Sequence, residues 1–331
     1  MKLSVIIVSY KVPYFLEQTL LSVRKAAINV PTEIIVVDNN SQDDTVAMLH
    51  QKFPEVLLIA NNKNTGFATA NNQGIDRATG EYLLFLNPDT VIREDTFDKI
   101  IGFADKQSNL GAIGVKMIDG TGNFLPESKR GFPSPAVAFY KTFGMSRLLP
   151  KSKTFNQYHL GYLDKDKNHE IDVLSGAFML VPRSVLEITG YWDEAFFMYG
   201  EDIDLSYRIK KAGFTNFYFA ETTIIHYKGE STKKGTLNYV RTFYEAMIIF
   251  AKKHFKGSKA SLFILMLQFA IYFRAALSLF SSFTKRIFLF FIDAVLMYGG
   301  MLLIKDSWET IRFDDPNYYD NNPTLIYFNF P

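Results

Sequence analysis

Cysteine is absent from the 331 residues of this chain, and its absence excludes several kinds of chemistry. Disulfide bonds, thiolate metal sites and a cysteine nucleophile are ruled out, and the composition is compatible with a reducing cytoplasm. An excess of charge of one sign is also lacking, because the formal net charge is only +2. Nucleic-acid-binding proteins usually carry a strong basic excess, so we expect no nucleic-acid partner.

Two phosphate-binding motifs are missing as well. The first expected turn, Ser-Tyr-Lys-Val-Pro at residues 9–13, lacks G-x-G-x-x-G, and G-x-x-x-x-G-K-[ST] occurs nowhere in the chain. These absences argue against a dinucleotide oxidoreductase and against a P-loop nucleotidase. The apolar run at the N-terminus is too short for a signal peptide and no small-residue cleavage site follows it, so it predicts a first strand.

Alternating strand-like and helix-like segments fill the first third of the chain. Hydrophobic residues make up 48% of the sequence, which is enough for a full core. Strand and helix patterns alternate four times, which is typical of an α/β fold with a doubly wound parallel sheet. The strands are expected at residues 3–8, 33–37, 56–59 and 82–86, and the helices from Pro13, from a Ser-x-x-Asp start at Ser41 and Asp44, and over about residues 68–78 and 95–106.

Residues 82–89 read Tyr-Leu-Leu-Phe-Leu-Asn-Pro-Asp and are expected to hold the central strand. The five apolar residues do not alternate with polar ones, so both faces of this strand should be buried. Pro88 ends the strand, and Asp89 follows its carboxyl end, where open α/β sheets bind ligands. An ordinary Asn-Pro-Asp turn is the alternative.

A polar residue follows each of the four expected strands. Because the carboxyl ends of parallel strands share one edge of a sheet, these side chains should form a line that suits the base, ribose and diphosphate of a nucleotide. Each of them could instead be a helix cap or a turn residue. The residues are Ser9, Asp38, Asn61 to Asn64, Asn87 and Asp89.

The pattern becomes less regular beyond residue 111. Residues 111–122 predict a strand and a glycine-bearing turn. Residues 123–168 show no clear periodicity and predict either a mobile substrate loop or a divergent surface loop. Order returns over residues 171–181, where Gly176 permits a close approach of the backbone.

Residues 196–208 place two carboxylates, Glu201 and Asp202, at the start of a helix that ends at Gly213. One of them is expected to be a general base, with a pKa raised by the aromatic residues Phe197 and Tyr199 in front of it. Stabilisation of the carboxylates by the helix dipole is the alternative. Gly176 and Tyr199 are the expected acceptor-binding residues.

An apolar strand brings His226 to its carboxyl end, just before a glycine-bearing loop. His226 is expected to be either a divalent-metal ligand or a hydrogen-bonded structural residue. The remaining histidines are expected to have no role in the site; they are His50, His159, His169 and His254.

Six of these segments together resemble the family 2 glycosyltransferases with the GT-A fold, especially the bacterial rhamnosyltransferase-like branch, over about residues 2–255. Each segment is weak evidence alone, but their common order is specific. They are Val-Ser-Tyr at 8–10, Val-Asp-Asn-Asn-Ser at 37–41, Asn-x-Gly-Phe with following asparagines at 64–72, Asn-Pro-Asp at 87–89, Gly-Glu-Asp-x-Asp-Leu at 200–205 and His-x-x-Gly-x-Ser at 226–231.

The resemblance implies a role for each matching residue. The donor nucleotide-sugar would lie against residues of the first half of the chain, a divalent cation, Mg²⁺ or Mn²⁺, would lie at the central strand, and Asp202 would be the catalytic base, with Glu201 next in line. The donor-binding residues would be Ser9, Tyr10, Asp38, Asn64, Gly66, Asn71 and Asn87, and the metal ligands Asp89 and His226.

The implied reaction is an inverting, metal-dependent transfer of a sugar from a nucleotide-diphosphate donor, with rhamnose favoured by the branch. The acceptor would be a lipid-linked glycan or an oligosaccharide in surface-polysaccharide synthesis, such as that of O-antigen. A non-catalytic nucleotide-sugar-binding homologue is the alternative, because Asn87 replaces the first aspartate of the D-x-D metal motif. A processive synthase is disfavoured, because its Gln-x-x-Arg-Trp motif and its several membrane spans are missing.

The segment after residue 255 differs from the rest of the chain, so we expect a GT-A domain over residues 1–255 and a helical extension over 256–331. The apolar runs 262–273 and 287–304 fall short of ~20 uncharged residues, and basic residues flank them. They predict helices lying on the cytoplasmic face of the membrane, as in a peripheral or monotopic protein. A shallow hairpin or one true span is a second interpretation, and a helical homodimer interface is the soluble alternative.

Overall fold

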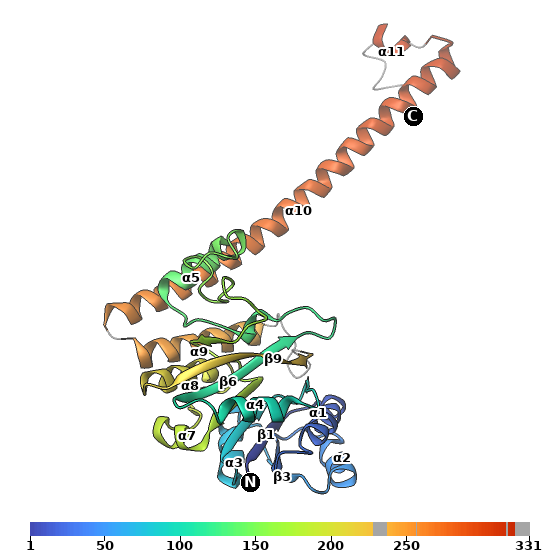
Figure 1. Cartoon of the computed structure of the whole chain (residues 1–331). Coiled ribbons are helices and arrows are strands. Elements are labelled where there is room, and N and C mark those ends of the chain that lie inside the picture. Colours follow the sequence, from blue (N-terminus) through green and yellow to red (C-terminus); the bar gives the residue numbers. More distant parts are fainter. Residues whose placement is uncertain (228–236, 256, 316, 322–331) are drawn as a thin grey trace. The chain divides into compact units, whose positions relative to one another are not determined.

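The computed structural model describes residues 1–227, 237–255, 257–315 and 317–321. The chain forms two compact units, Met1–Leu267 and Gln268–Pro331 (Figure 1). The first unit therefore includes residues 256–267, which were assigned to the extension from the sequence. They belong to it because Phe263 and Leu267 are buried in the same hydrophobic cluster as Phe250.

A nine-stranded sheet forms the centre of the first unit. Its strands are β1 (Leu3–Ser9), β2 (Thr32–Asp38), β3 (Leu57–Ala60), β4 (Tyr82–Leu86), β5 (Thr90–Val91), β6 (Leu110–Ile118), β7 (His169–Ile171), β8 (Phe178–Pro182) and β9 (Thr215–His226). The order is β3-β2-β1-β4-β8-β6-β9-β5, with β7 paired to β9 beside this path. The first four strands are parallel, as expected.

The expected, mostly parallel sheet also contains antiparallel strands. Strand β8 runs antiparallel to both β4 and β6, and β5 and β7 run antiparallel to β9. An apolar run buried on both faces has the same composition in either direction, so residues 171–181 did not indicate the orientation of β8. The sheet is thus mixed: β1 to β4 form one parallel part, and β6 and β9 also pair in parallel.

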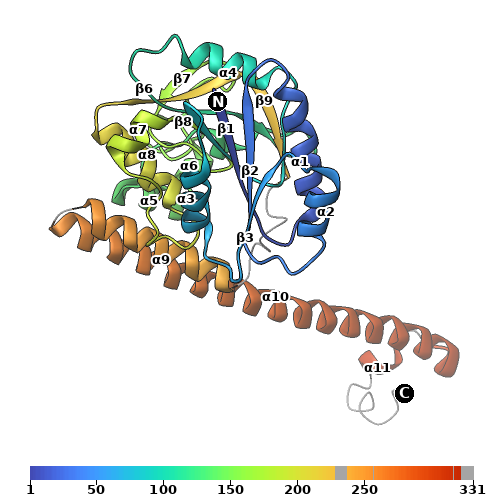
Figure 2. The same cartoon turned by 90° about the horizontal axis from the view of Figure 1, so that it is seen from below.

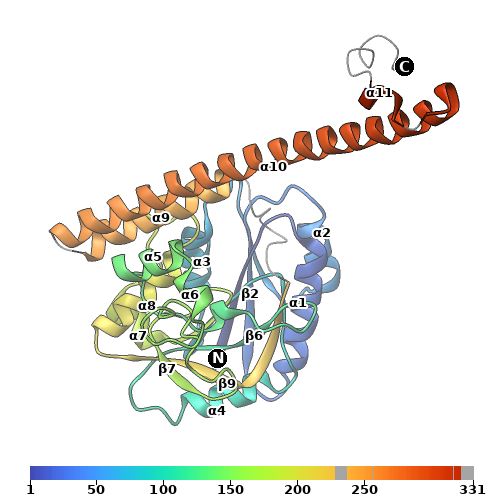
Figure 3. The ribbon, with the colours of Figure 1, turned by 90° about the horizontal axis from the view of Figure 1, so that it is seen from above.

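Helices cover both faces of this sheet (Figure 2). They are α1 (Pro13–Ala26), α2 (Thr45–Lys52), α3 (Phe67–Arg77), α4 (Thr96–Ala104), α5 (Pro135–Thr142), α6 (Met145–Leu148), α7 (Arg183–Thr189), α8 (Glu201–Lys211) and α9 (Leu237–His254), followed by α10 (Ser258–Phe313) and α11 (Tyr318–Asn321). Viewed from above, α1 and α2 lie on one side of β1 and β2, and α3, α7 and α8 lie on the other (Figure 3).

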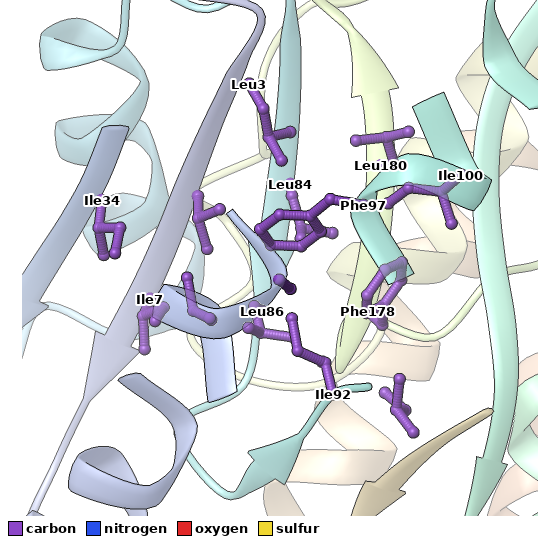
Figure 4. Packing of buried hydrophobic residues seen from close by; sticks show 14 of the residues in the cluster. Leu3, Ile7, Ile34, Leu84, Leu86, Ile92, Phe97, Ile100, Phe178 and Leu180 are labelled. Carbon is purple, nitrogen blue, oxygen red and sulfur yellow. The ribbon is translucent and has the colours of Figure 1, made fainter. Parts of the chain in front are cut away.

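The two faces of β4 explain why its sequence does not alternate. All five residues of the strand are buried. Leu84 and Leu86 join a cluster with residues of α1 and α4, and Figure 4 shows them beside Phe97. Leu83 and Phe85 point to the opposite cluster, which includes residues of α3, α7 and α8. Because both faces of β4 are buried, the chain leaves the core only beyond the carboxyl end of the strand.

The expected helix start at Ser41 is wrong. Helix α2 begins at Thr45, and its N-cap residue, Asp44, makes no side-chain capping bond. The hydroxyl of Ser41 instead donates to the carboxylate of Asp38, three residues earlier. Serine side chains often satisfy a local acceptor in this way rather than capping a helix.

The second unit contains most of α10. Both apolar runs of the C-terminal sequence lie in this one helix rather than in separate helices. Within the described residues, one segment, Ile287–Phe313, is long and apolar enough to cross a membrane, with a mean hydropathy of 2.3. The side chains of residues 287–298 are all exposed.

Candidate active site

The carboxyl ends of β2, β1 and β4 lie next to one another at one edge of the sheet. Ser9 pairs in register with Asp38, and Ile7 with Leu86, so the residues that follow Leu86 come next in the line. The N–H of Asn61 donates to the carbonyl of Asp38 at 2.9 Å, which adds the end of β3. The polar residues that follow the four strands therefore share one edge, as their positions in the sequence predict.

Ser9 and Asp38 are buried polar residues at the centre of this edge. The Oγ of Ser9 has no hydrogen-bond partner among the described residues. Asp38 accepts bonds from both the N–H and the hydroxyl of Ser41, and the Oγ of Ser41 accepts from the N–H of Lys11 at 3.0 Å. Tyr10 is half-buried, with the Nζ of Lys11 at 5.2 Å from its ring centroid.

Asn39, which was not singled out from the sequence, organises the loop between β3 and α3. Its amide nitrogen lies 2.9 Å from the Oδ1 of Asn64 and 3.2 Å from the carbonyl oxygen of Gly66. Its Oδ1 accepts a bond from the N–H of Thr65 at 2.9 Å. Its place in the Val-Asp-Asn-Asn-Ser segment, directly after a buried strand, was the available signal. The side chain holds the expected ribose–diphosphate residues against the end of β2.

Gly66 joins this loop to the segment that precedes α8. Its φ is +86°, and a Cβ added there would lie 2.7 Å from the carbonyl oxygen of Phe197. The next N–H, that of Phe67, donates to the same oxygen at 2.8 Å. Asn71 behaves differently, because its side-chain amide donates to the carbonyl of Phe67 within α3.

The Asn-Pro-Asp turn is held from both sides. The hydroxyl of Thr19 on α1 lies 2.7 Å from the carbonyl oxygens of Pro88 and Thr90. On the other side, β5 pairs with β9 so that Thr90 lies opposite His226, and the N–H of Tyr227 donates to the carbonyl of Asp89 at 3.0 Å. Residues 228–231, the rest of the His-x-x-Gly-x-Ser segment, lie outside the described residues.

Asp89 and His226 form the candidate metal site. The Oδ1 of Asp89, a residue only 1% exposed, lies 3.3 Å from the Nε2 of His226, and the amide nitrogen of Asn87 lies 3.4 Å from the same Nε2. Neither this Oδ1 nor the Nδ1 of His226 has a hydrogen-bond partner within the described ranges. A carboxylate oxygen and an imidazole nitrogen fit Mg²⁺ or Mn²⁺.

The metal site would be incomplete without further ligands. Across the part of the chain that the structure describes, no group of three or more histidine, cysteine, aspartate or glutamate side chains could hold a metal ion. The described residues thus offer two candidate ligands, and a bound diphosphate and water would have to supply the others.

Asp202, at the first turn of α8, receives hydrogen bonds from three different segments. Its Oδ2 accepts from the Nη2 of Arg130 at 2.5 Å and from the N–H of Gly176 at 3.3 Å. Its Oδ1 accepts from the N–H of Ile203 at 2.8 Å. Ala177, the residue after Gly176, accepts a bond from the N–H of Asn87 at 3.0 Å through its carbonyl oxygen. Residues 176–177 therefore connect Asp202 to the Asn-Pro-Asp turn.

Glu201 is buried beside Asp202, with 7% of its surface exposed. Burial raises the pKa of Glu201, and the neighbouring Asp202 carboxylate adds to the effect. Its Oε2 has no hydrogen-bond partner in the described parts of the chain. The aromatic residue that packs inward beside α8 is Phe196, whereas Phe197 is 52% exposed. Tyr199 has a φ of +69° and faces Phe243 of α9, with ring centroids 6.4 Å apart.

His254 belongs to a buried ion-pair cluster, a structural role that the sequence did not indicate. Its Nε2 lies 2.6 Å from the Oδ1 of the fully buried Asp204, which also pairs with Arg208 and Lys253. Burial alone would raise the pKa of Asp204, but the hydrogen bond from His254 and the charge of Arg208 lower it to about 2. This cluster ties α8, the helix that carries Asp202, to the end of α9.

The family model described as glycosyl transferase family 2 matches residues 4–188 of the chain. An N-acetylglucosaminyl-diphospho-decaprenol L-rhamnosyltransferase of Mycobacterium tuberculosis is 28% identical over 270 residues, which cover 77% of this chain and 85% of that protein. The low-salt glycan biosynthesis hexosyltransferase Agl10 of Haloferax volcanii is 28% identical over 216 residues, which cover 63% of this chain and 62% of that protein.

Solved structures share the fold at low identity. The 1–349 structure of S. aureus TarS has a TM-score of 0.52 and 17% identity, and the match covers 81% of this chain and 71% of that one. It covers only 41% of the longer TarS structure. The mannosyltransferase PcManGT from Pyrobaculum calidifontis, in complex with GDP-Man and Mn²⁺, has a TM-score of 0.52 and 17% identity, covering 83% and 75%. The expected GT-A fold is confirmed.

Proposed function

This chain belongs to glycosyl transferase family 2, and we propose that it transfers a sugar from a nucleoside-diphosphate donor to a lipid-linked glycan in surface-polysaccharide synthesis. We propose rhamnose as the sugar, because a relative similar over most of both chains is a rhamnosyltransferase whose name gives a diphospho-decaprenol-linked acceptor. The observation that carries the proposal is the pair of residues 176–177, which bonds Asn87 on one side and Asp202 on the other.

The donor would lie along the strand ends. Ser9, Tyr10 and Asp38 would hold the nucleoside, and the loop that Asn39 orders, with Asn64 and Gly66, would face the ribose and diphosphate. The orphaned Oγ of Ser9 supports this placement, because a buried polar atom without a partner is usually satisfied by water or a ligand. Asn71 is the weakest of the expected donor residues, since its amide is already bonded inside α3.

The metal-binding residues would be Asp89 and His226. A bound Mg²⁺ or Mn²⁺ would supply positive charge to the leaving diphosphate. The protein's own contribution is to keep the two ligands in place: Thr19 fixes the turn that carries Asp89, and the pairing of β5 with β9 fixes His226 beside it.

Asp202 would act as the general base in a single displacement. It would take the proton of an acceptor hydroxyl while the hydroxyl oxygen forms a bond with C1 of the sugar. The bond between C1 and the diphosphate oxygen breaks, and its electron pair leaves with the nucleoside diphosphate. Attack from the face opposite the leaving group inverts the anomeric configuration, and no covalent protein nucleophile is needed.

The base assignment is tested by comparing two neighbouring carboxylates. Replacing Asp202→Asn should lower kcat by about 10²–10⁴-fold, the usual weight of general-base catalysis. Glu201→Gln is the matched control, because Glu201 is buried on the same helical turn, and it should change kcat much less. Transfer would be measured with nucleotide-sugars at fixed Mn²⁺. If Asp202→Asn keeps nearly normal turnover and Glu201→Gln loses it, Glu201 is the base.

The alternative is a non-catalytic nucleotide-sugar-binding protein. It is favoured by Asn87 at the first position of the metal motif and by the presence, among the described residues, of only two metal-ligand side chains at the site. Hydrolysis of a nucleotide-sugar by the wild-type protein without acceptor separates the two functions. Mn²⁺-dependent release of the nucleoside diphosphate would support the enzyme, and binding without release would support the alternative.

The C-terminal segment would attach the protein to the cytoplasmic face of the membrane. Residues 287–298 are exposed on every side of their helix, which suits a bilayer better than one apolar stripe would. The segment Ile287–Phe313 follows Lys285 and Arg286, and basic residues are favoured on the cytoplasmic side of a membrane helix. Attachment would keep the site near a lipid-linked acceptor.

A further inference from the structure

We propose that Arg130 is a positioning residue that aims the carboxylate of Asp202 at the acceptor hydroxyl. The inference rests on the proposed function, in which Asp202 is the general base. Arg130 belongs to the stretch 123–168, which has no sequence periodicity and to which the proposed reaction assigns no role. The contacts of this one side chain nevertheless reach the centre of the site.

The backbone of Arg130 is anchored before its side chain is considered. Its N–H donates to the carbonyl of Val173 at 3.2 Å, and the N–H of Val173 donates back at 2.9 Å. This two-residue bridge places Arg130 directly beside the segment that leads to Gly176. The residue is 9% exposed, so the guanidinium enters the site from within the protein.

The guanidinium is held by fixed acceptors. Its Nη2 donates to the carbonyl of Leu174 at 2.6 Å as well as to the Oδ2 of Asp202 at 2.5 Å, and the side chain also hydrogen-bonds with that of Tyr158. Arginine presents several N–H donors in a rigid plane, so bonds to two neighbours restrict its orientation strongly. Arg130 is thus a rigid support rather than a flexible surface charge.

The two carboxylate oxygens of Asp202 have different hydrogen-bond partners and therefore different roles in the proposed reaction. Oδ2 accepts from Arg130 and from the N–H of Gly176, which together use its two lone pairs. Oδ1 accepts only from the N–H of Ile203 among the described contacts. One lone pair on Oδ1 therefore remains, and we assign the proton of the acceptor hydroxyl to this oxygen.

In this arrangement Arg130 forms no bond with substrate. The acceptor proton moves to Oδ1, the acceptor oxygen bonds to C1, and the electron pair of the breaking C1–O bond leaves on the diphosphate. Arg130 keeps its charge and holds Oδ2 throughout. Its value lies in alignment, because a misplacement of about 1 Å in a reacting group can cost about 10²-fold in rate.

Lys129 provides a matched control next to Arg130 in the sequence. It is also buried, at 2% exposure, but its Nζ donates to the carbonyl of Leu160 at 2.6 Å rather than to Asp202. The bond of Lys129 joins two parts of the irregular stretch 123–168 to each other. Of the two side chains, only that of Arg130 bonds to the proposed base.

The test compares Arg130→Met, Arg130→Lys, Arg130→Ala and Lys129→Met in the full-length protein. Arg130→Met should lower kcat by about 10²-fold while the KM for the donor changes by less than about threefold. Arg130→Lys should lose less, and added guanidinium ion should restore part of the activity of Arg130→Ala. Lys129→Met should lower the melting temperature but leave kcat within about twofold of wild type. Thermal shifts with UDP, dTDP or GDP plus Mn²⁺ would show that the donor site remains intact.

Two results would overturn the inference while leaving the proposed function in place. One is an Arg130→Met variant with normal kcat in a protein that Asp202→Asn inactivates. The other is a parallel loss of kcat, nucleotide binding and melting temperature in both Arg130→Met and Lys129→Met, since this would show a purely structural role. If the wild-type protein neither transfers nor hydrolyses any nucleotide-sugar, the proposed function fails, and the inference fails with it.

Discussion

At Gly66 the backbone of the donor loop passes so close to Phe197 that no side chain fits between them. The positive φ of this residue is also one that residues with a Cβ rarely adopt. Because Phe67 bonds to the same carbonyl of Phe197, the donor loop and the segment before α8 are joined at this point. The consequence is that a single methyl group should disturb both halves of the site.

Replacing Gly66→Ala should lower the free energy of unfolding by more than about 1 kcal/mol, because the strained φ adds to the close contact. It should also reduce the thermal stabilisation that a nucleoside diphosphate with Mn²⁺ provides. Gly102→Ala is the control: Gly102 lies in α4 with open space around its missing Cβ, so alanine should stabilise the helix slightly. A Gly66→Ala protein that melts and binds nucleotide like wild type would contradict the argument.

Residues in strands and motifs were easier to predict than isolated partners. Asp89 and His226 were both predicted as metal ligands from their motifs, and the Oδ1 of Asp89 lies 3.3 Å from the Nε2 of His226. Arg130 was missed because its stretch has no periodicity, and His254 because a histidine near the end of a helix carries no sign of its partner. Pairing between distant segments is set by tertiary packing, which a single sequence does not express.

Helix α8 is held in place by a buried charge. Asp204 has no exposed surface, and its partners come both from α8 itself, through Arg208, and from the end of α9, through Lys253 and His254. A buried carboxylate is costly unless it is paired, so α8 and α9 are expected to separate only together with the loss of this cluster. Asp202 lies two residues before Asp204, so its orientation depends on the same helix.

The cluster predicts an acid-sensitive contribution to stability. The pKa of Asp204 is lowered from an ordinary 3.8 to about 2, so its contribution is complete above the ordinary value and is lost as the pH falls toward about 2. Asp204→Asn should therefore cost roughly 2 kcal/mol of unfolding free energy at neutral pH, and the gap should close in acid. Chemical denaturation at several pH values would measure it.

Asp172→Asn is the control for Asp204, because Asp172 forms a half-exposed ion pair with Lys210 on the same helix. Such pairs contribute about 0–1 kcal/mol, so its variant should unfold almost like wild type at every pH. An Asp204→Asn variant as stable as Asp172→Asn at neutral pH would show that the buried cluster does not stabilise the fold.

Secondary-structure elements were predictable from the sequence where one interaction determines their position. The non-alternating run of β4 predicted a strand buried on both faces, and the parallel order of β1 to β4 followed from the alternation with helices. The direction of β8 and the start of α2 did not follow. The first depends on which neighbour the strand pairs with, and the second on whether Ser41 bonds to the helix or to Asp38.

On the scale of the whole molecule, the chain combines a catalytic unit with an apolar helical segment. Ile287–Phe313 is long and apolar enough to cross a membrane. The apolar runs 262–273 and 287–304 were nevertheless expected to form separate or surface-lying helices. Arg274 follows the first of these runs and carries a charge. A single charge does not end a helix, so both runs lie in α10.

Membrane attachment is expected to survive extraction of the full-length protein with alkaline carbonate. Leu296→Arg, near the middle of the apolar segment, should shift the protein toward the soluble fraction, because a central arginine costs about 2.5–3.5 kcal/mol on insertion. Ile311→Arg is the control, since this exposed residue lies near the end of the segment. A wild-type protein that stays soluble without detergent would exclude attachment, and a dimer in light scattering would then favour a helical homodimer.

The antiparallel strand β8 has a consequence for how this enzyme can diversify. The carbonyl of Ala177 bonds to Asn87, and the N–H of Gly176 bonds to Asp202. Because Gly176 and Ala177 are adjacent residues, covalent geometry limits the distance between the Asn-Pro-Asp turn and Asp202. Loops that recognise the sugar or the base of the nucleotide can be exchanged in evolution without altering this spacing. In the proposed single displacement, substrate choice would therefore be able to change among related proteins while the inversion at C1 of the sugar is retained.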